Sequence, residues 1–267
     1  MSVIAGTSGW QYRDWRGAFY PDRTPQRRWL EYYATQFATV ENNGTFYRLP
    51  SRDAFASWRD RVSGDFVMTV KASRYLTHVR RLRDPAGPVK RLVEAAAGLG
   101  GRLGPVLLQL PPDLRGVPHL LAECLGQFPA AVRVAVEPRH ESWWTDEVRD
   151  VLTARNAALC WADRAGAALT PLWRTADWGY LRLHEGDGEP WPRYSQPALS
   201  AWADRITAAW PADADVFVYF NNDQAAAAPR NAAAFATAVA SRGREATRAW
   251  PDAVEFGHGE AVDVSGP

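Results

Sequence analysis

Cysteine, histidine and metal-binding motifs are scarce in this 267-residue sequence. There are two cysteines, Cys124 and Cys160, both in apolar segments, and five histidines. His-Glu-x-x-His, paired-cysteine motifs and Asp-rich calcium loops are absent. We therefore expect reduced cysteines, no metal site and no other cofactor, although a single Mg²⁺ or Mn²⁺ on Glu137, Asp163 and His184 stays open as an alternative.

Long hydrophobic runs are also missing. No stretch approaches the ~20 apolar residues of a membrane helix, and the start "MSVIAGTSGW" lacks the basic end and apolar run of a signal peptide. The sequence thus predicts a cytoplasmic protein without a membrane partner. Its 13 Trp, 10 Phe and 9 Tyr are ample for one large core.

Lysine is rare, because Lys71 and Lys90 are the only two among 31 basic residues. The net charge is +1, but residues 1–91 hold 16 basic against 8 acidic side chains. The densest basic segment, 71–83, suits either an anionic ligand or nucleic acid, or is simply a solvated face. The near-neutral total argues against strong nucleic-acid binding.

Strand-like and helical segments alternate along the chain. This alternation predicts an α/β protein, a single (β/α)8 TIM barrel over residues 1–256, followed by a disordered tail at 257–267. An open doubly wound sheet is the alternative, but no Gly-x-Gly-x-x-Gly fingerprint supports it. The link after the sixth strand is short and weakly helical. The eight expected strands are 3–7, 38–42, 65–71, 105–110, 132–137, 157–163, 179–184 and 215–221.

Polar side chains end most of these strands. Side chains of barrel strands alternate between interior and helices, and barrel enzymes place their sites at the carboxyl ends. We therefore expect one polar site at the barrel mouth, with structural ion pairs that only lock the strands as the alternative. The expected catalytic residues are Glu41, Lys71, Glu137, His140, Asp163 and His184. The expected binding residues are Trp10, Tyr12, Asn43, Tyr47, Gln109, Arg139, Arg182, Asn221 and Asn222.

The charges at this mouth favour acid–base chemistry on a polar or anionic small molecule. The mouth has as many expected cations (Lys71, Arg139 and Arg182) as expected acids. A metal cluster needs more carboxylates and imidazoles than cations. Arginine forks hold phosphate or carboxylate. Ser8 and Ser142 lack the context of a nucleophile elbow.

Several motifs, read in order, resemble the YecE-like family, catalogued as domain of unknown function 72. They are "GTSGWQYRDWRGAFYP", "VENNGTFYRLP", "FVMTVKASRYLTH", "LGPVLLQLPP", "VAVEPRHESW" and "VYFNND". The resemblance extends to about residue 245 and implies a TIM barrel without an established activity. By position it supports the motif residues Glu41, Asn43, Thr45, Tyr47, Arg48, Lys71, His78, Gln109, Pro111, Glu137, Arg139, His140, Trp143, Asn221 and Asn222. Gly44 and Glu185 depart from the family pattern.

Three functions remain open on the sequence alone. The first is a metal-independent hydrolase, lyase or isomerase, or a non-catalytic binder, for a polar or phosphorylated small molecule. The second is a nucleic-acid-binding or endonuclease-like protein that uses the same mouth. The third is a non-catalytic adaptor whose mouth binds the terminus of another protein.

Overall fold

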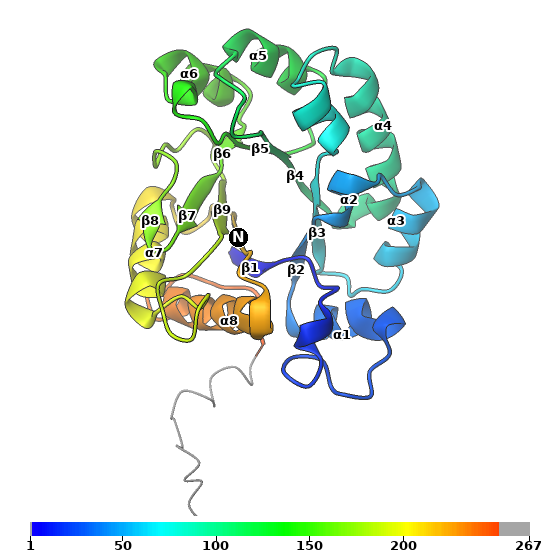
Figure 1. Cartoon of the computed structure of the whole chain (residues 1–267), viewed down its shortest axis with the longest axis vertical. Helices are drawn as coiled ribbons and strands as arrows, with labels where there is room; N and C mark the ends of the chain where they lie inside the picture. Colours follow the sequence, from blue (N-terminus) through cyan, green and yellow to red (C-terminus); the bar gives the residue numbers. More distant parts are fainter. Residues whose placement is uncertain (1, 251–267) are drawn as a thin grey trace, which may run out of the picture.

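Parallel strands pair in sequence order around a curled sheet in the computed structural model, which describes residues 2–250 (Figure 1). Strands β1 to β5 each pair with the next, β10 lies beside β1, and β9 lies beside β10. Their bounds are β1 (Val3–Ser8), β2 (Thr39–Asn42), β3 (Val67–Lys71), β4 (Leu103–Gln109), β5 (Val134–Glu137), β9 (Gly179–Leu183) and β10 (Val216–Phe220).

The two ends of the sheet meet on the sixth expected strand. Its first half, β6 (Ala158–Leu159), pairs with β5, and its second half, β7 (Trp161–Arg164), pairs with β9. Only Cys160 separates them, and its N–H donates to the Val136 carbonyl at 2.8 Å. The predicted TIM-barrel-like α/β fold is thereby confirmed. The weakly helical link contains the short β8 (Ala167–Ala168), antiparallel to β7.

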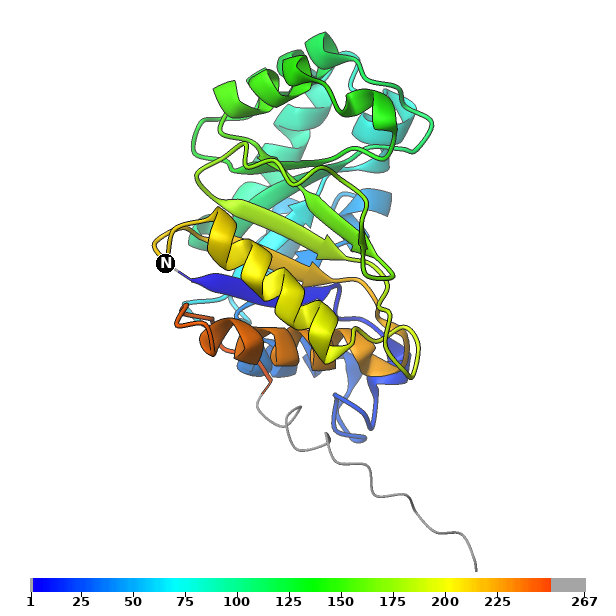
Figure 2. The ribbon, with the colours of Figure 1, turned by 90° about the vertical axis from the view of Figure 1, so that its left-hand side faces the viewer.

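Helices surround the sheet on its outer face (Figure 1). In the side view, α7 and α8 cross that face (Figure 2). Side-chain caps begin three of the helices, because Ser51, Thr145 and Ser195 each accept a hydrogen bond from the backbone three residues on. The α-helices are α1 (Trp29–Gln36), α2 (Gly44–Tyr47), α3 (Arg52–Arg59), α4 (Ala86–Ala96), α5 (Pro118–Gly126), α6 (Asp146–Ala154), α7 (Gln196–Ala209) and α8 (Ala227–Ala240). The short helices are η1 (Arg13–Trp15), η2 (Gln26–Arg28), η3 (Tyr75–Val79), η4 (Ala97–Arg102), η5 (Glu141–Trp143) and η6 (Gln224–Ala226).

Apolar side chains form two separate clusters. A large one fills the space between the sheet and the helices. A smaller one fills the barrel interior, with Tyr180, Phe217 and Tyr219 on one side and small residues such as Ala135 and Ala158 on the other. This inner cluster closes the barrel below the carboxyl ends of the strands, so polar side chains at those ends rest on an apolar floor.

Three expectations concern the chain as a whole. Within residues 2–250, no helix is long and apolar enough to cross a membrane. The expected tail at 257–267 lies outside the described residues. Cys124 and Cys160 are buried and not bonded to each other.

Gly98 provides a test of the packing of η4 against α3. A Cβ at this position would lie 2.2 Å from the Arg52 carbonyl oxygen and 2.9 Å from Cβ of Phe55. We expect Gly98→Ala to lower the free energy of unfolding by about 1–3 kcal/mol, because backbone must shift to admit the methyl group. Gly101, in the same short helix, has no atom within 4 Å of such a Cβ. Urea denaturation should therefore find Gly101→Ala within about 0.5 kcal/mol of the parent, and equal losses in both variants would contradict this packing.

Candidate functional site

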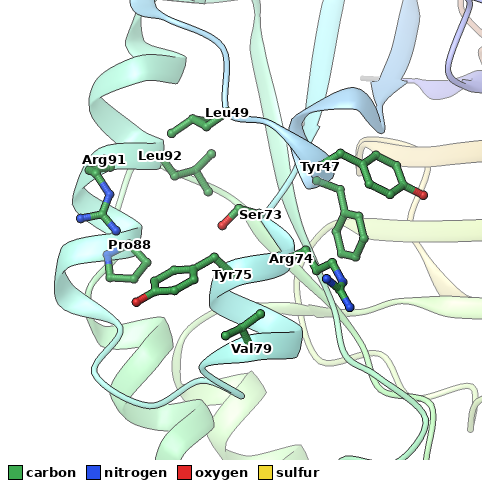
Figure 3. A pocket seen from close by; sticks show the side chains of 10 residues that line it. Tyr47, Leu49, Ser73, Arg74, Tyr75, Val79, Pro88, Arg91 and Leu92 are labelled. Carbon is green, nitrogen blue, oxygen red and sulfur yellow. The ribbon is translucent and has the colours of Figure 1, made fainter.

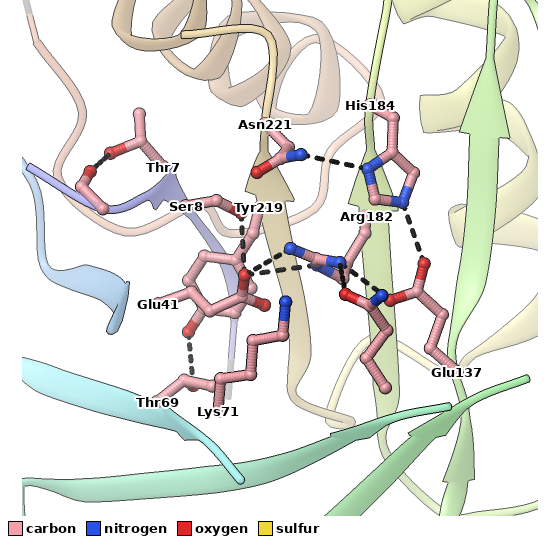
Figure 4. A network of polar contacts seen from close by, with 12 residues as sticks. Thr7, Ser8, Glu41, Thr69, Lys71, Glu137, Arg182, His184, Tyr219 and Asn221 are labelled. Atoms are coloured by element: carbon pink, nitrogen blue, oxygen red, sulfur yellow. Dashed lines mark hydrogen bonds and ion pairs between the residues drawn. The ribbon is translucent and has the colours of Figure 1, made fainter. Parts of the chain in front are cut away.

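A buried guanidinium, that of Arg182 on β9, lies at the centre of the polar mouth (Figure 4). Its Nη2 donates to Glu41 Oε1 at 2.8 Å, and its Nη1 donates to Glu137 Oε2 at 2.8 Å. Glu41 is the last residue but one of β2 and Glu137 ends β5, so the Arg182 side chain joins three separate strands. Gln109 Oε1, at the end of β4, accepts a further bond from Nη1 at 3.3 Å.

The carboxylate of Glu41 is fully buried and surrounded by donors. Ser8 Oγ donates to Oε1 at 2.8 Å, and the Tyr180 hydroxyl donates to Oε2. A buried carboxylate is stable only when it is paired and hydrogen-bonded. The Glu41 side chain, placed directly after the apolar Val40, meets that requirement.

Glu137 holds a second group of donors on its other oxygen. Oε1 forms an ion pair with Arg139 Nη2 at 2.7 Å and accepts a hydrogen bond from His184 Nε2 at 2.8 Å. Nδ2 of Asn221 lies 3.1 Å from Nδ1 of His184 and donates a hydrogen bond to it. The contacts with Glu137 and Asn221 together fit a neutral imidazole that carries its hydrogen on Nε2, and Arg139 Nη2 lies 3.1 Å from the same Nε2.

Burial and charge shift the ionisation of these groups in opposite directions. Burial by itself would raise the pKa of Glu137, but Arg182, His184 and Arg139 outweigh it and hold that pKa well below its usual value. Burial lowers the pKa of His184, although Glu137 opposes the shift. Near neutral pH, Glu137 is therefore ionised and His184 is neutral.

Lys71 differs from both arginines, because its ammonium has no carboxylate within ion-pair distance in the described part of the chain. It extends from the end of β3 toward Arg182 (Figure 4). Its Nζ lies 4.5 Å from the centre of the Phe46 ring, a cation–π contact. Burial, with the charge of Arg182, lowers the pKa of Lys71 to about 8.

The remaining sequence-predicted residues lie at varying distances from this cluster. Tyr12 is half-buried, donates its hydroxyl proton to the Ser8 carbonyl and has its pKa raised by burial and by Asp223 and Glu41. Asn43 follows β2, and its Oδ1 is buried without a hydrogen-bond partner in residues 2–250. Both lie at the rim of the site.

Four other candidates have no hydrogen bond or ion pair with the central charges among residues 2–250, and their expected roles stay predictions. Trp10 is buried in the outer core, edge-on to Trp58. His140 begins η5 by accepting from Ser142 N. Asn222 donates to the Pro192 carbonyl and to Asn231 on α8. Tyr47 is 82% exposed and lines a neighbouring groove. None of these four contacts Arg182, Glu41 or Glu137 through a hydrogen bond or ion pair described in residues 2–250.

The expected inward orientation of Asp163 is wrong. Its Oδ1 accepts from the Tyr194 hydroxyl at 2.6 Å, and its Oδ2 accepts from Trp202 Nε1 of α7 at 3.2 Å. Asp163 thus faces the helices. Burial raises its pKa against the effect of both hydrogen bonds.

The donor set is poorly suited to a metal ion. Among residues 2–250, no three His, Cys, Asp or Glu side chains are grouped as metal ligands. Both oxygens of Glu41 and of Glu137 already accept hydrogen bonds from protein donors. The absence of a metal remains a prediction from the sequence.

Three residues of the site lie outside the catalytic and binding sets expected from the sequence. Ser8 and Tyr180 hold Glu41, and Phe46 contacts Lys71. Strand alternation could have found Tyr180, since it lies two residues before Arg182 on β9. It could not have found Phe46, which lies on α2 outside any strand.

The closed parallel sheet and the polar cluster at its carboxyl ends define a TIM-barrel-like α/β protein with a candidate site in the mouth. A family model described as "Protein of unknown function DUF72" matches residues 4–254. The chain belongs to this family, which confirms the resemblance found in the sequence.

Relatives agree with this assignment. A curated protein of Bacillus subtilis, UPF0759 protein YunF, is 23% identical over 265 residues, covering 86% of this chain and 92% of its own. A crystal structure of a DUF72 family protein from Thermotoga maritima is 27% identical with a TM-score of 0.77, over 89% of this chain and 98% of that one. One from Enterococcus faecalis, 16% identical with a TM-score of 0.73 over 89% and 95%, has the same fold.

Neutralising Glu137 tests how strongly the paired charges hold the barrel together. We expect Glu137→Gln to lower the free energy of unfolding at pH 7 by about 3–5 kcal/mol, because Arg182 and Arg139 each lose a buried anionic partner. Asp204→Asn is the control. It breaks an ion pair with Arg242 in which Asp204 is 66% exposed, and should cost less than about 1 kcal/mol.

The difference between Glu137→Gln and the parent should depend on pH. The pKa of Glu137 is held below the ordinary value of 4.5, so its stabilising effect is complete above that pH and declines as the pH falls toward the lowered pKa. Chemical denaturation of both proteins from pH 7 down to about pH 3 measures this. A loss as small as that of Asp204→Asn, or one that grows in acid, would contradict the account.

Proposed function

We propose that the protein binds a small anionic substrate in the barrel mouth and that Lys71 exchanges a proton with it. The observation that carries this proposal is the unpaired ammonium of Lys71 beside a set of balanced charges. Glu41 and Glu137 offset Arg182 and Arg139, and His184 is neutral. The protonated lysine then gives the cluster one net positive charge, which attracts an anion.

A lysine suits proton exchange better than an arginine at this position. Arginine stays protonated in proteins, whereas a buried lysine shifts its pKa readily. With a pKa of about 8, Lys71 is mostly protonated at pH 7 and about one tenth neutral. A group with its pKa close to the working pH serves both as general acid and as general base.

The neighbours of Lys71 suit a polar substrate. Gln109 and Asn221 are half-buried. One atom of each side-chain amide makes a hydrogen bond within the cluster, Oε1 of Gln109 with Arg182 and Nδ2 of Asn221 with His184. The free part of each amide is available to substrate hydroxyl or carbonyl groups. Arg139, with a side chain 21% exposed, adds a cation at the edge of the site.

Nucleic-acid binding through the basic 71–83 segment is less well supported. Arg80 pairs with Asp84, and Arg81 pairs with Asp113. These carboxylates neutralise part of the basic segment, so fewer free cations remain to contact phosphates.

Sulfate binding at pH 8 provides a direct test, because sulfate does not titrate in this range. Lys71 is about half protonated at that pH, and a bound anion should raise its pKa, so we expect uptake of up to about half a proton per site. Calorimetric titration in buffers of different ionisation enthalpy measures this uptake.

Two variants separate charge from proton exchange. Lys71→Arg should bind sulfate without proton uptake, whereas Lys71→Met should bind it about tenfold more weakly or worse. Equal proton uptake by the parent and Lys71→Arg would overturn the proposal, as would unchanged sulfate affinity in Lys71→Met.

A further inference from the structure

A groove of about 390 Å³ lies beside the mouth, between α2, η3 and α4 (Figure 3). Its walls include Tyr47 from α2, Tyr75 and Val79 from η3, and Leu92 from α4. The volume is within the range of small-molecule sites.

Exposed apolar side chains gather at this groove. Of the six large apolar side chains that are exposed within residues 2–250, three line it: Tyr47 at 82%, Val79 at 57% and Tyr75 at 47%. Such side chains are normally scattered singly, and their grouping at one hollow marks a place where an apolar partner binds.

The charges of the groove all have one sign. Arg74 and Arg91 line it, and no Asp or Glu does. Neither arginine makes an ion pair with a carboxylate of the described residues. The nearby Arg80 and Arg81 differ in that each has an aspartate partner. The groove is therefore complementary to an anion as well as to an apolar group.

Phe46 connects the groove to the mouth. Its ring lines the groove and also lies 4.5 Å from Lys71 Nζ. A ligand that packs against Phe46 from the groove side thus reaches the region of Lys71.

We propose that the groove binds an aromatic ring that bears a phosphate or carboxylate, as one arm of a substrate that extends to Lys71. The ring packs against Tyr75, Phe46 and Leu92, since aromatic pairs gain stability beyond the area that they bury. Arg91, at the end of the groove away from Tyr47 and Arg74 (Figure 3), holds the anionic group with its forked side chain. The extension to Lys71 rests on the proposed function, whereas binding of the ring in the groove does not.

Four probes separate the ring from the charge. We expect 1-naphthyl phosphate or 1-naphthoate to bind at least tenfold more tightly than both cyclohexyl phosphate, which is not planar, and 1-naphthol, which is neutral. The tighter of the two charged naphthyl probes identifies the preferred anionic group. Naphthyl fluorescence or calorimetry gives the affinities.

Single substitutions then locate the binding. Tyr75→Ala and Arg91→Ala should each weaken the better naphthyl probe at least fivefold, and both side chains are exposed, so the variants should keep the parent's melting temperature. Arg83→Ala removes an exposed cation of the same basic segment, and Leu172→Ala trims a side chain 40% exposed between β7 and β9. Both controls should bind like the parent.

The outcomes for the groove and for the mouth are distinguishable. If the naphthyl probes bind no better than cyclohexyl phosphate, or if Tyr75→Ala and Arg91→Ala match the controls, the groove proposal is overturned, even where sulfate still causes proton uptake at Lys71. If the groove variants lose affinity but Lys71→Met retains sulfate binding, the groove proposal holds and the proposed function fails.

Discussion

The buried guanidinium of Arg182 sets the constraint that the rest of the mouth satisfies. A charge in this position must be paired, and its removal from water is offset only by good geometry on every donor. Glu41 and Glu137 supply two anions from opposite sides, which ties β2, β5 and β9 together above the apolar floor of the barrel. Each carboxylate in turn needs further donors, which Ser8, Tyr180, His184 and Arg139 provide.

Arg182 and Arg139 are both paired with carboxylates. Lys71 is the cation of the cluster that has no carboxylate partner among the described residues. The same network that stabilises the barrel also affects the ionisation of this lysine, because burial and the charge of Arg182 together lower its pKa. Phe46 contacts the ammonium and also lines the groove. Under the proposed function, structural ion pairs and a proton-exchanging lysine belong to one arrangement, so the structural and the functional interpretation of the mouth are compatible.

Strand alternation predicted much of this arrangement from the sequence. It placed Lys71, Arg182 and Asn221 in the interior. This worked because β3, β9 and β10 are regular strands, and near the carboxyl end of each strand the polar side chains lie on a single face. It failed at Asp163, because both faces of segment 157–163 are apolar, so alternation could not show which face is inward. Loop positions were also beyond its reach. His140 and Tyr47 follow the ends of strands, where backbone turns rather than periodicity decide the direction of a side chain.

The central claim is that Lys71 is a lysine with a lowered pKa. Reductive methylation with ¹³C-formaldehyde labels its amine, and the sequence contains only one other lysine, Lys90. In a Lys90→Arg background, the lysine signal of the ¹³C spectrum comes from Lys71. The signal of the methylated α-amino group must be assigned separately from it. A titration from pH 6 to pH 11 should give Lys71 a midpoint near pH 8. A midpoint at the ordinary lysine value of 10.5 would contradict the account.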